Sequence, residues 1–388
     1  MEFTYQSVRN HFVTQFNAEP FIVRSPGRIN MIGEHTDYND GFVMPAAIDK
    51  EIIFALAPSG TANTIIHALN FQETINVDMN STQRVQQPAW ANYLLGVIRQ
   101  LTDRGHSLKP FACVFGGNIP AGSGMSSSAA LECGFAFALS ELNDLQIPKV
   151  ELAKIGQWSE HNFVGVRCGI MDQFANMMGK ENHVIQLDCR SLQFQYFPIQ
   201  LQGYSIVLFN SGVKHSLASS EYNIRRAECE EGVHIIKSRK KEIFSLRDVS
   251  VNDLEANRSF LSENVYNRCK YIVQEIERVQ LASADLQRGD LKAFGTKMFE
   301  THDGLSNLYK VSCAELDYLV TMAHHHMEVI GSRLMGGGFG GCTINIIQTN
   351  AVDRITDMIS TGYREQFKIE IEPYRVQIKD GTSLATVY

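Results

Sequence analysis

A glycine- and serine-rich loop that leads into a strongly apolar helix is the feature that most constrains how this chain folds. The loop is Gly122-Ser123-Gly124-Met125-Ser126-Ser127-Ser128, and it follows a buried-type strand at residues 111–115. The helix predicted over residues 129–142 is apolar on nearly every face, which is typical of a central helix. Free backbone N–H groups and the helix dipole at such an N-terminus favour an anion. The loop is therefore a candidate phosphate site, and the alternative is that Ser126 only caps the helix.

The loop differs from two common phosphate-binding sequences. A Walker A loop requires a lysine that is absent here, and the third glycine of a dinucleotide fingerprint is replaced by Ser127. The serine hydroxyls would add hydrogen-bond donors, and one of them is a candidate ligand for Mg²⁺ beside a nucleotide.

A second polar segment follows an apolar strand predicted at residues 21–24, which we expect to enter a loop at Ser25-Pro26-Gly27. The segment carries Arg28, Asn30, Glu34, His35, Thr36 and Asp37 within eleven residues. A guanidinium, two carboxylates and an imidazole form the donor and acceptor set that fixes a polyhydroxylated ligand. The alternative is a loop of solvated charges. The flanking apolar strands make this alternative less favoured, because loops at strand ends tend to line clefts.

Two further carboxylates, Glu160 and Asp172, lie twelve residues apart. Phosphoryl transfer needs one carboxylate to help hold Mg²⁺ and one near the attacking hydroxyl, so these residues are candidates to divide the two tasks. Either could instead be an ordinary helix residue, and for Glu160 alone that interpretation is favoured. The three histidines at 324–326 are interpreted as a solvated face, because adjacent helix residues point in different directions.

A run of five glycines in six residues, Gly336 to Gly341, lies between two apolar segments. A hairpin turn would explain part of it. The glycine content exceeds what a turn needs, which favours a close approach of this backbone to a ligand or to the phosphate loop.

Length and composition set broader limits. A chain of 388 residues is expected to form two domains with a cleft between them, and we place these at 1–200 and 201–388 in an α+β arrangement. The net charge of -7, without long basic runs, argues against a nucleic-acid partner. The eight scattered cysteines show no zinc spacing. No signal peptide or membrane span is apparent, so we expect a cytoplasmic protein. We also expect a monomer.

Taken together, these segments resemble the galactokinase family of the GHMP kinase superfamily. Residues 27–41 are similar to the galactokinase signature along their whole length, residues 120–130 resemble the superfamily phosphate loop, and residues 334–342 resemble its glycine-rich third motif. Further similarity at residues 90–93, 160–161, 168–173 and 219–223 extends the resemblance over nearly the full chain.

The resemblance implies a two-domain fold, with an N-terminal domain like the second domain of ribosomal protein S5 and a ferredoxin-like C-terminal domain. It also implies roles for individual residues. Asp172 would be the catalytic base and Arg28 its partner. Sugar contacts would come from Glu34, His35, Thr36, Asp37, Gly169, Asp172 and Tyr222. ATP would bind Trp90, Gly122, Ser123, Gly124, Met125, Ser126, Ser127 and Ser128, with Mg²⁺ on Ser128 and Glu160.

The activity that the resemblance implies is Mg-ATP-dependent phosphorylation of galactose at its anomeric hydroxyl. Two alternatives remain at this point. One is an N-acetylgalactosamine or arabinose kinase of the same superfamily, because small pocket changes decide between sugars. The other is a non-catalytic sensor of galactose and ATP, but relatives of that kind lack a Ser-Ala pair that is present here as Ser128-Ala129. The chain departs from the family pattern at Met125 and at Met335, where leucine and threonine are usual.

Overall fold

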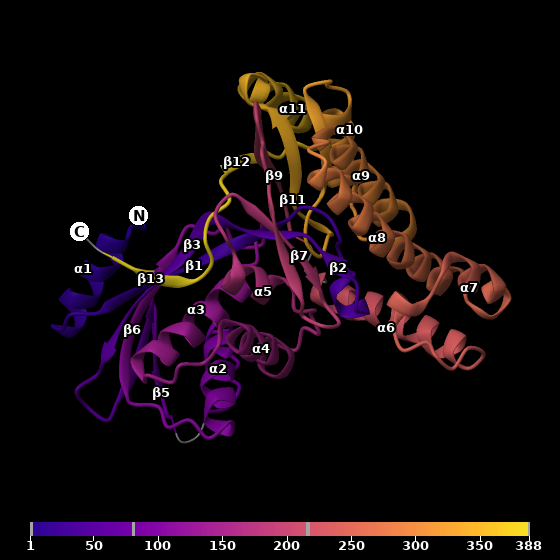
Figure 1. Ribbon diagram of the computed structural model, residues 1–388. Helices are drawn as coiled ribbons and strands as arrows, with labels where there is room; N and C mark the ends of the chain where they lie inside the picture. The colour runs from indigo at the N-terminus through magenta and orange to yellow at the C-terminus, as the bar shows by residue number, and fades with distance from the viewer. Residues whose placement is uncertain (1–2, 80–81, 215–217, 387–388) are drawn as a thin grey trace.

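A six-stranded mixed sheet forms the N-terminal part of the molecule in the computed structural model, which describes residues 3–79, 82–214 and 218–386 (Figure 1). Its strands, in spatial order, are β13 (Ser383–Ala385), β1 (Phe21–Asn30), β3 (Pro45–Pro58), β6 (Phe111–Gly117), β4 (Thr64–Ala68) and β5 (Glu73–Val77). The β4–β6 pair is parallel, and the other pairs are antiparallel. The last strand of the chain therefore lies beside the first.

Strand β1 is longer than predicted, and the expected loop at residues 25–27 is wrong. The strand continues to Asn30, with an irregular register against β3 between Pro26 and Arg28. Proline has no N–H to give to a sheet ladder, so a bulge is a position that accommodates it. A Cβ atom added to Gly27 would lie 2.7 Å from the carbonyl oxygen of Met125, which explains the glycine. As a result, Arg28 is held by a strand rather than by a loop.

Helices cover both faces of this sheet. One face packs against α2 (Ala91–Asp103), α3 (Ser127–Leu142), α4 (Lys149–Ser159) and α5 (Met171–Met178), and the other against α1 (Tyr5–Phe16). The prediction of a buried central helix is confirmed, because Leu131, Phe135 and Leu139 of α3 are buried in the core of the first face. The N-terminus of α3 consequently lies deep in the molecule.

The C-terminal part is built on a four-stranded antiparallel sheet (Figure 1). Helices pack on both of its faces. Its strands, in spatial order, are β10 (Val329–Leu334), β11 (Gly340–Gln348), β9 (Tyr204–Lys214) and β12 (Glu372–Val376). Val207 and Phe209 of β9 pack with α10 (Ala314–His324) and α11 (Val352–Phe367). Ile206 and Leu208 face α8 (Glu263–Gln287) and α9 (Leu291–Asp303).

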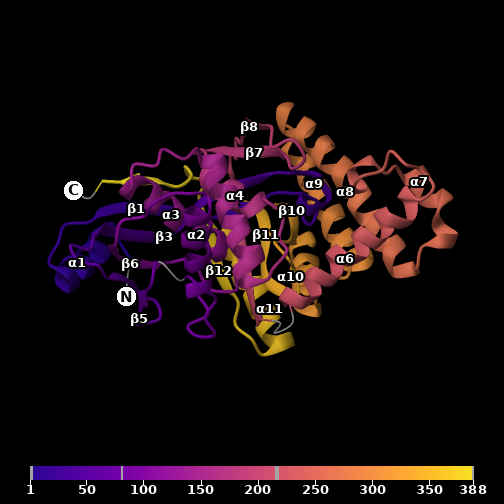
Figure 2. The same ribbon diagram turned by 90° about the horizontal axis from the view of Figure 1, so that it is seen from below.

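The remaining elements connect or extend these two sheets. A small antiparallel sheet contains β2 (Phe42–Val43), β7 (His183–Asp188) and β8 (Phe194–Pro198). Figure 2 shows that α6 (Ala218–Lys237) and α7 (Val251–Ala256) form the end of the molecule farthest from both termini. Short helical turns are η1 (Asp37–Asn39), η2 (Glu160–Val164), η3 (Leu246–Asp248), η4 (Arg258–Phe260), η5 (Gly304–Tyr309) and η6 (Thr349–Ala351).

One of the hydrophobic clusters contains residues of both parts. Ile29 and Met31 of the N-terminal part pack in the same buried cluster as Ile206 and Leu208 of the C-terminal part. The division near residue 200 stays a prediction. Within the described residues, no helix combines the length and the apolar character that crossing a membrane requires.

Candidate active site

A small polar pocket of about 170 Å³ brings together most of the residues predicted to bind a sugar. Its lining residues include Arg28, Glu34, His35, Asp37, Glu160, Gly169, Asp172, Tyr222, Gly336 and Gly337. They come from β1, the segment after it, η2, the start of α5, α6 and the glycine run. Segments far apart in the sequence therefore meet at one point.

An ion pair between Arg28 and Asp172 occupies one wall of this pocket. The guanidinium donates through Nε to Oδ1 of Asp172 and through Nη2 to Oδ2, both at 2.7 Å. Such bidentate pairing fixes orientation as well as charge. Arg28 also donates through Nη1 to the carbonyl oxygen of Gly124, and the hydroxyl of Ser126 donates to Oδ2 of Asp172. The pair is thus joined directly to the glycine- and serine-rich loop.

The sequence left open that Ser126 only caps the helix, and the structure does not support this interpretation. It stands at the N-cap position of α3 in a left-handed conformation, with φ 56°, and makes no capping hydrogen bond. A serine side chain in this region of φ is uncommon and costs free energy. The conformation turns the hydroxyl toward Asp172 and leaves the amides that open α3 free for an anion.

Glu34 lies at the bottom of the pocket in a fully satisfied network that includes Arg333, a residue that the sequence did not single out. Its Oε2 accepts from Asn30 at 2.6 Å and from Arg333 at 2.8 Å, and its Oε1 accepts from the amide of Gly336 at 3.0 Å. Burial raises the pKa of Glu34, and the ion pair with Arg333 opposes this effect. Arg333 itself is completely buried. An arginine in an apolar strand directly before the glycine run was the available signal.

His35 is held in the pocket wall by a chain of hydroxyl groups. Its Nδ1 lies 2.7 Å from the hydroxyl of Tyr38, which lies 2.7 Å from the hydroxyl of Tyr309. Burial and the nearby charge of Arg225 lower the pKa of His35 to about 3. The imidazole is therefore neutral at physiological pH and offers one donor and one acceptor. The centroid of the Tyr222 ring lies 5.3 Å from the centroid of the His35 ring.

Asp37 and Gly169 are in close contact. Oδ1 of Asp37 accepts from the amide of Tyr38 at 3.0 Å. Burial and the carboxylate of Asp172 raise the pKa of Asp37 to about 7. A Cβ atom added to Gly169 would lie 2.0 Å from Oδ2 of Asp37, so no other residue fits there without displacing the carboxylate.

Thr36 differs from its neighbours, because its side chain does not line the pocket. The hydroxyl lies 2.9 Å from the carbonyl oxygen of Gly33 and 2.6 Å from that of Phe42. Both contacts close the loop on itself. In this structure Thr36 supports the loop that carries Glu34, His35 and Asp37.

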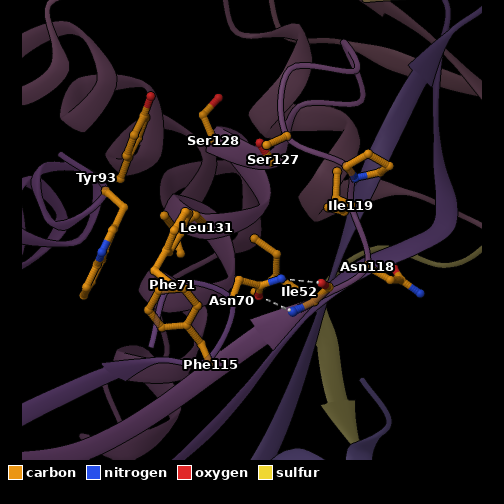
Figure 3. A pocket seen from close by; sticks show the side chains of 14 residues that line it. Ile52, Asn70, Phe71, Tyr93, Phe115, Asn118, Ile119, Ser127, Ser128 and Leu131 are labelled. Atoms are coloured by element: carbon orange, nitrogen blue, oxygen red, sulfur yellow. Dashed lines mark hydrogen bonds between the residues drawn. The ribbon is translucent and has the colours of Figure 1, made fainter. Parts of the chain in front are cut away.

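A larger and mainly apolar pocket of about 480 Å³ lies on the other side of the loop (Figure 3). Phe71, Trp90, Tyr93, Phe115 and Leu131 line it, and Ser127 and Ser128 lie at one side of it. The indole of Trp90 donates to Glu73 at 2.6 Å and stacks on Phe71 with an angle of 5° between the planes. This shape suits a flat aromatic ring.

Asn70, at the edge of this pocket, holds the end of β6. Its amide group exchanges two hydrogen bonds with the backbone of Gly117, at 2.9 and 3.0 Å, as the dashed lines in Figure 3 show. Asn70, Phe71 and Tyr93 had no role in the sequence prediction. Asn70 and Phe71 follow a strand without a distinguishing motif, and Tyr93 lies in the segment 90–93, whose resemblance to the family assigned a role only to Trp90.

The rest of the phosphate loop forms its scaffold. Ser123 is buried and donates to the carbonyl oxygen of Pro120 at 2.7 Å, and Met125 is packed in the core, where its carbonyl oxygen accepts from the amide of Arg28 at 3.0 Å. Gly122 and Gly124 have positive φ, 76° and 78°, which other residues rarely adopt.

The glycine run makes a close backbone contact with this loop, as predicted. A Cβ atom added to Gly336 would lie 3.4 Å from the carbonyl oxygen of Gly124, and one added to Gly341 would lie 3.3 Å from that of Gly122. Met335 is buried in the core. The run therefore supports the phosphate loop from behind and supplies the Gly336 amide that binds Glu34.

Glu160 and Ser128 lie between the two pockets, where a metal-bound phosphate would have to bridge them. Burial and the charge of Asp172 raise the pKa of Glu160 to about 7, and a hydrogen bond with Ser128 opposes the shift. Oε2 of Glu160 accepts from Gln173 at 2.9 Å. Gln173 also reaches the buried carboxyl of Glu132, at 3.4 Å. A bound cation would lower the free-energy cost of burying these carboxylates in their charged form.

No group of three or more His, Cys, Asp or Glu side chains suited to a metal ion is found among the described residues. One carboxylate and one hydroxyl still fit Mg²⁺, because in kinase sites this ion takes few protein ligands and completes its shell with phosphates and water. Burial raises the pKa of Glu132 far above its usual range. Neither Glu132 nor Gln173 was assigned a role from sequence. Glu132 lies within an apolar helix, where only its charge marks it.

Three family models match this chain. They are the galactokinase galactose-binding signature at residues 10–58, the GHMP kinase N-terminal domain at residues 92–180 and the GHMP kinase C-terminal domain at residues 282–365. The galactokinase of Thermotoga maritima is 41% identical over 359 residues, which cover 92% of this chain and 98% of that protein. The galactokinase of Chloroflexus aggregans is 39% identical over 367 residues, covering 95% and 93%.

This chain belongs to the galactokinase family. The crystal structure of Lactococcus lactis galactokinase complexed with galactose agrees with it at a TM-score of 0.94, with 32% identity over 97% of this chain and 99% of that one. Methanococcus jannaschii mevalonate kinase shares the fold at 16% identity and a TM-score of 0.62, covering 94% of this chain and 99% of that one. The predicted GHMP kinase fold is confirmed.

Proposed function

We propose that this galactokinase-family chain transfers the γ-phosphoryl group of Mg-ATP to the anomeric hydroxyl of galactose, with the sugar in the small polar pocket and the nucleotide in the apolar one. The observation that carries the proposal is the Arg28–Asp172 ion pair, which lies in the polar pocket and bonds to the loop that opens α3. Membership in the family, and galactose in the Lactococcus lactis structure, support the choice of sugar.

The proposed chemistry follows from the geometry of the pair. Phosphoryl transfer has a loose transition state, so the protein mainly positions the reactants and neutralises charge. We assign Asp172 as the group that accepts the proton of the attacking hydroxyl, because its carboxylate faces the pocket with a fixed orientation. Arg28 orients that carboxylate and offsets the negative charge that develops on the transferred group.

The sugar would be oriented by groups that are already in position. Glu34 and Asp37 present carboxylate oxygens, neutral His35 presents a donor or an acceptor, and Tyr222 packs beside it. Because these groups are held by the backbone and by buried partners, little conformational entropy is lost when the ligand binds. Gly169 keeps Asp37 close to the pocket wall.

The nucleotide would lie along the phosphate loop. Adenine fits the apolar pocket near Trp90, and the phosphates fit the amides that open α3 together with Ser127 and Ser128. Ser128 and Glu160 are the groups that would hold Mg²⁺, which neutralises phosphate charge in such reactions.

Asp172→Asn tests the proposal directly. We expect this variant to lose at least about 1,000-fold in kcat while it still binds galactose, because the change removes the proton acceptor and keeps the shape. A coupled ADP-release assay and calorimetric titration with galactose would measure the two effects. Near-normal turnover would remove Asp172 from the proposed role.

Asp188→Asn is the matched control. Asp188 also pairs with an arginine, Arg247, at 3.3 Å, and the exposed fraction of its side chain, 23%, is close to the 26% of Asp172. It lines neither pocket. The control should therefore retain its turnover, and a similar loss in both variants would show that the assay reports general damage.

A further inference from the structure

A buried polar network lies behind the Arg28–Asp172 pair and includes a residue close to the end of the chain. Ser25 of β1, Asn176 of α5 and Thr382 have side chains that are at most 1% exposed. The hydroxyl of Thr382 donates to Oδ1 of Asn176 at 2.7 Å, and Nδ2 of Asn176 donates to Oγ of Ser25 at 2.9 Å. Oγ of Ser25 donates to the carbonyl oxygen of Ala130 in α3 at 2.7 Å. Each of these side-chain protons therefore has a defined acceptor.

The network connects the same three elements that carry the proposed catalytic groups. Arg28 on β1, Asp172 on α5 and Ser126 at the start of α3 meet in the polar pocket. Ser25 lies three residues before Arg28, while Asn176 and Ala130 each lie four residues after their counterparts. Four residues are one helical turn, about 6 Å along the axis. The network is thus a second layer of contacts directly behind the first.

Thr382 is the member of this network that belongs to none of the three elements. Its amide donates to the carbonyl oxygen of Asn176 at 2.8 Å, and the amide of Gly381 donates to that of Gly179 at 2.8 Å. These bonds satisfy carbonyl groups at the end of α5 that have no partner within the helix. Lys149 of α4 donates to the carbonyl oxygen of Thr382 at 2.7 Å. The segment before β13 is therefore fastened at several points.

The same contacts fix α5 against the bulge of β1. Nδ2 of Asn176 also donates to the carbonyl oxygen of Pro26 at 2.6 Å, at the irregular position of the strand. Helix α5 has only eight residues, of which Met171, Phe174 and Met177 also pack in the core of the first face. A fully satisfied buried polar network adds directional contacts to this apolar packing and helps to specify a single placement of the helix.

We infer that Thr382, near the C-terminal end of the chain, is a positioning residue for phosphoryl transfer, which acts through Asn176 and α5 to hold Asp172 in register with Arg28. The inference rests on the proposed function of the Arg28–Asp172 pair. Small displacements of a reacting group are costly, since about 1 Å can reduce a rate by roughly 100-fold. The C-terminal segment then completes the catalytic arrangement although Thr382 lines neither pocket.

Thr382→Val tests the inference, because it removes the hydroxyl and keeps the shape. We expect kcat to fall about tenfold while KM for galactose and for ATP changes less than about twofold, as for a loss confined to the transition state. Thr382→Ser should recover most of the lost rate. A kcat that stays unchanged in Thr382→Val would overturn the inference, and so would failure of both Thr382→Val and Thr382→Ala to fold.

A double-mutant cycle separates positioning from general destabilisation. If Thr382 acts through Asp172, Thr382→Val should not lower the residual rate of Asp172→Asn any further. An equal loss in both backgrounds would contradict the inference. If instead Asp172→Asn alone retains turnover, the proposed function fails first.

Thr343→Val provides a matched control in the other sheet. Thr343 of β11 is completely buried, and its hydroxyl accepts from Asn345 at 3.1 Å. This variant should lower the melting temperature about as much as Thr382→Val and leave kcat unchanged. A tenfold fall of kcat in both variants would attribute the effect to lost stability and overturn the inference.

Discussion

The polar pocket and the apolar pocket differ in the groups that line them and in the partners that hold those groups. The polar pocket, of about 170 Å³, is lined by buried charged groups whose partners are protein atoms, such as the Glu34–Arg333 pair. The apolar pocket, of about 480 Å³, is lined by aromatic rings, of which Phe71 is 54% exposed. Burying a charge costs free energy of folding unless the charge is paired. Removal of a partly exposed aromatic ring leaves no buried charge without a partner.

This difference predicts where the molecule tolerates change. In the polar pocket, a substitution that leaves a buried partner unsatisfied should lower stability and sugar recognition together. A substitution that neutralises a destabilising buried charge should instead raise stability and still weaken sugar recognition. In the apolar pocket, a substitution removes only contact area, so nucleotide affinity should fall slightly and stability hardly at all.

Arg333→Met should have the largest effect. It leaves Glu34 as an unpaired buried carboxylate and removes the donor to the carbonyl oxygen of Met31, which lies at 3.0 Å. Loss of one member of a buried ion pair costs on the order of 3–5 kcal/mol of unfolding free energy. Urea denaturation would measure it. The surface pair Arg354–Glu328 supplies the control, since Arg354→Met should change stability by less than about 1 kcal/mol.

Asp37→Asn should stabilise the free protein and weaken sugar binding. An unfolded aspartate loses its proton near pH ~4, whereas the pKa of Asp37 in the folded protein is about 7. The native state therefore binds more protons between these values, and the contribution of Asp37 to stability falls as pH rises through them. The gain in melting temperature from Asp37→Asn should be larger at pH 8 than at pH 5.

The functional effect and the control complete this test. The same variant should lose on the order of 10- to 100-fold in kcat/KM for galactose, because a charged hydrogen-bond acceptor is removed. Asp40→Asn, at a side chain that is 42% exposed, should show no such pH-dependent gain. A gain that is equal at both pH values would contradict burial of the Asp37 charge as the cause.

Phe71→Ala should have the smallest effect. Its ring stacks on Trp90 at the open side of the apolar pocket, so its loss should raise KM for ATP roughly three- to tenfold. KM for galactose and the melting temperature should stay the same within error. Phe244→Ala, at an exposed ring away from both pockets, is the control and should change neither KM. If Phe71→Ala lost as much stability as Arg333→Met, the expected difference between the two pockets would be contradicted.

The motifs could be predicted from sequence because their chemistry is local. The loop at residues 122–128 and the helix after it show their role through glycine, serine and apolar runs, and the structure confirms their order. The contact between the glycine run and this loop was also predictable, since so many glycines indicate a close approach.

Other features depend on tertiary contacts that no local pattern reveals. The extension of β1 through Pro26 follows from pairing with β3, and propensity alone indicates a loop there. Arg333 and Glu132 are single charged residues within apolar segments, and their partners are distant in sequence. Thr382 is a further case, because its partner Asn176 lies 206 residues away.

The most direct test of the account is the structure of a complex with galactose, Mg²⁺ and a non-hydrolysable ATP analogue. We expect a carboxylate oxygen of Asp172 within about 2.6–3.2 Å of the anomeric oxygen, and that oxygen in line with the terminal phosphorus of a triphosphate seated on the amides that open α3. A galactose whose anomeric oxygen is turned away from Asp172, or a triphosphate bound elsewhere, would contradict it.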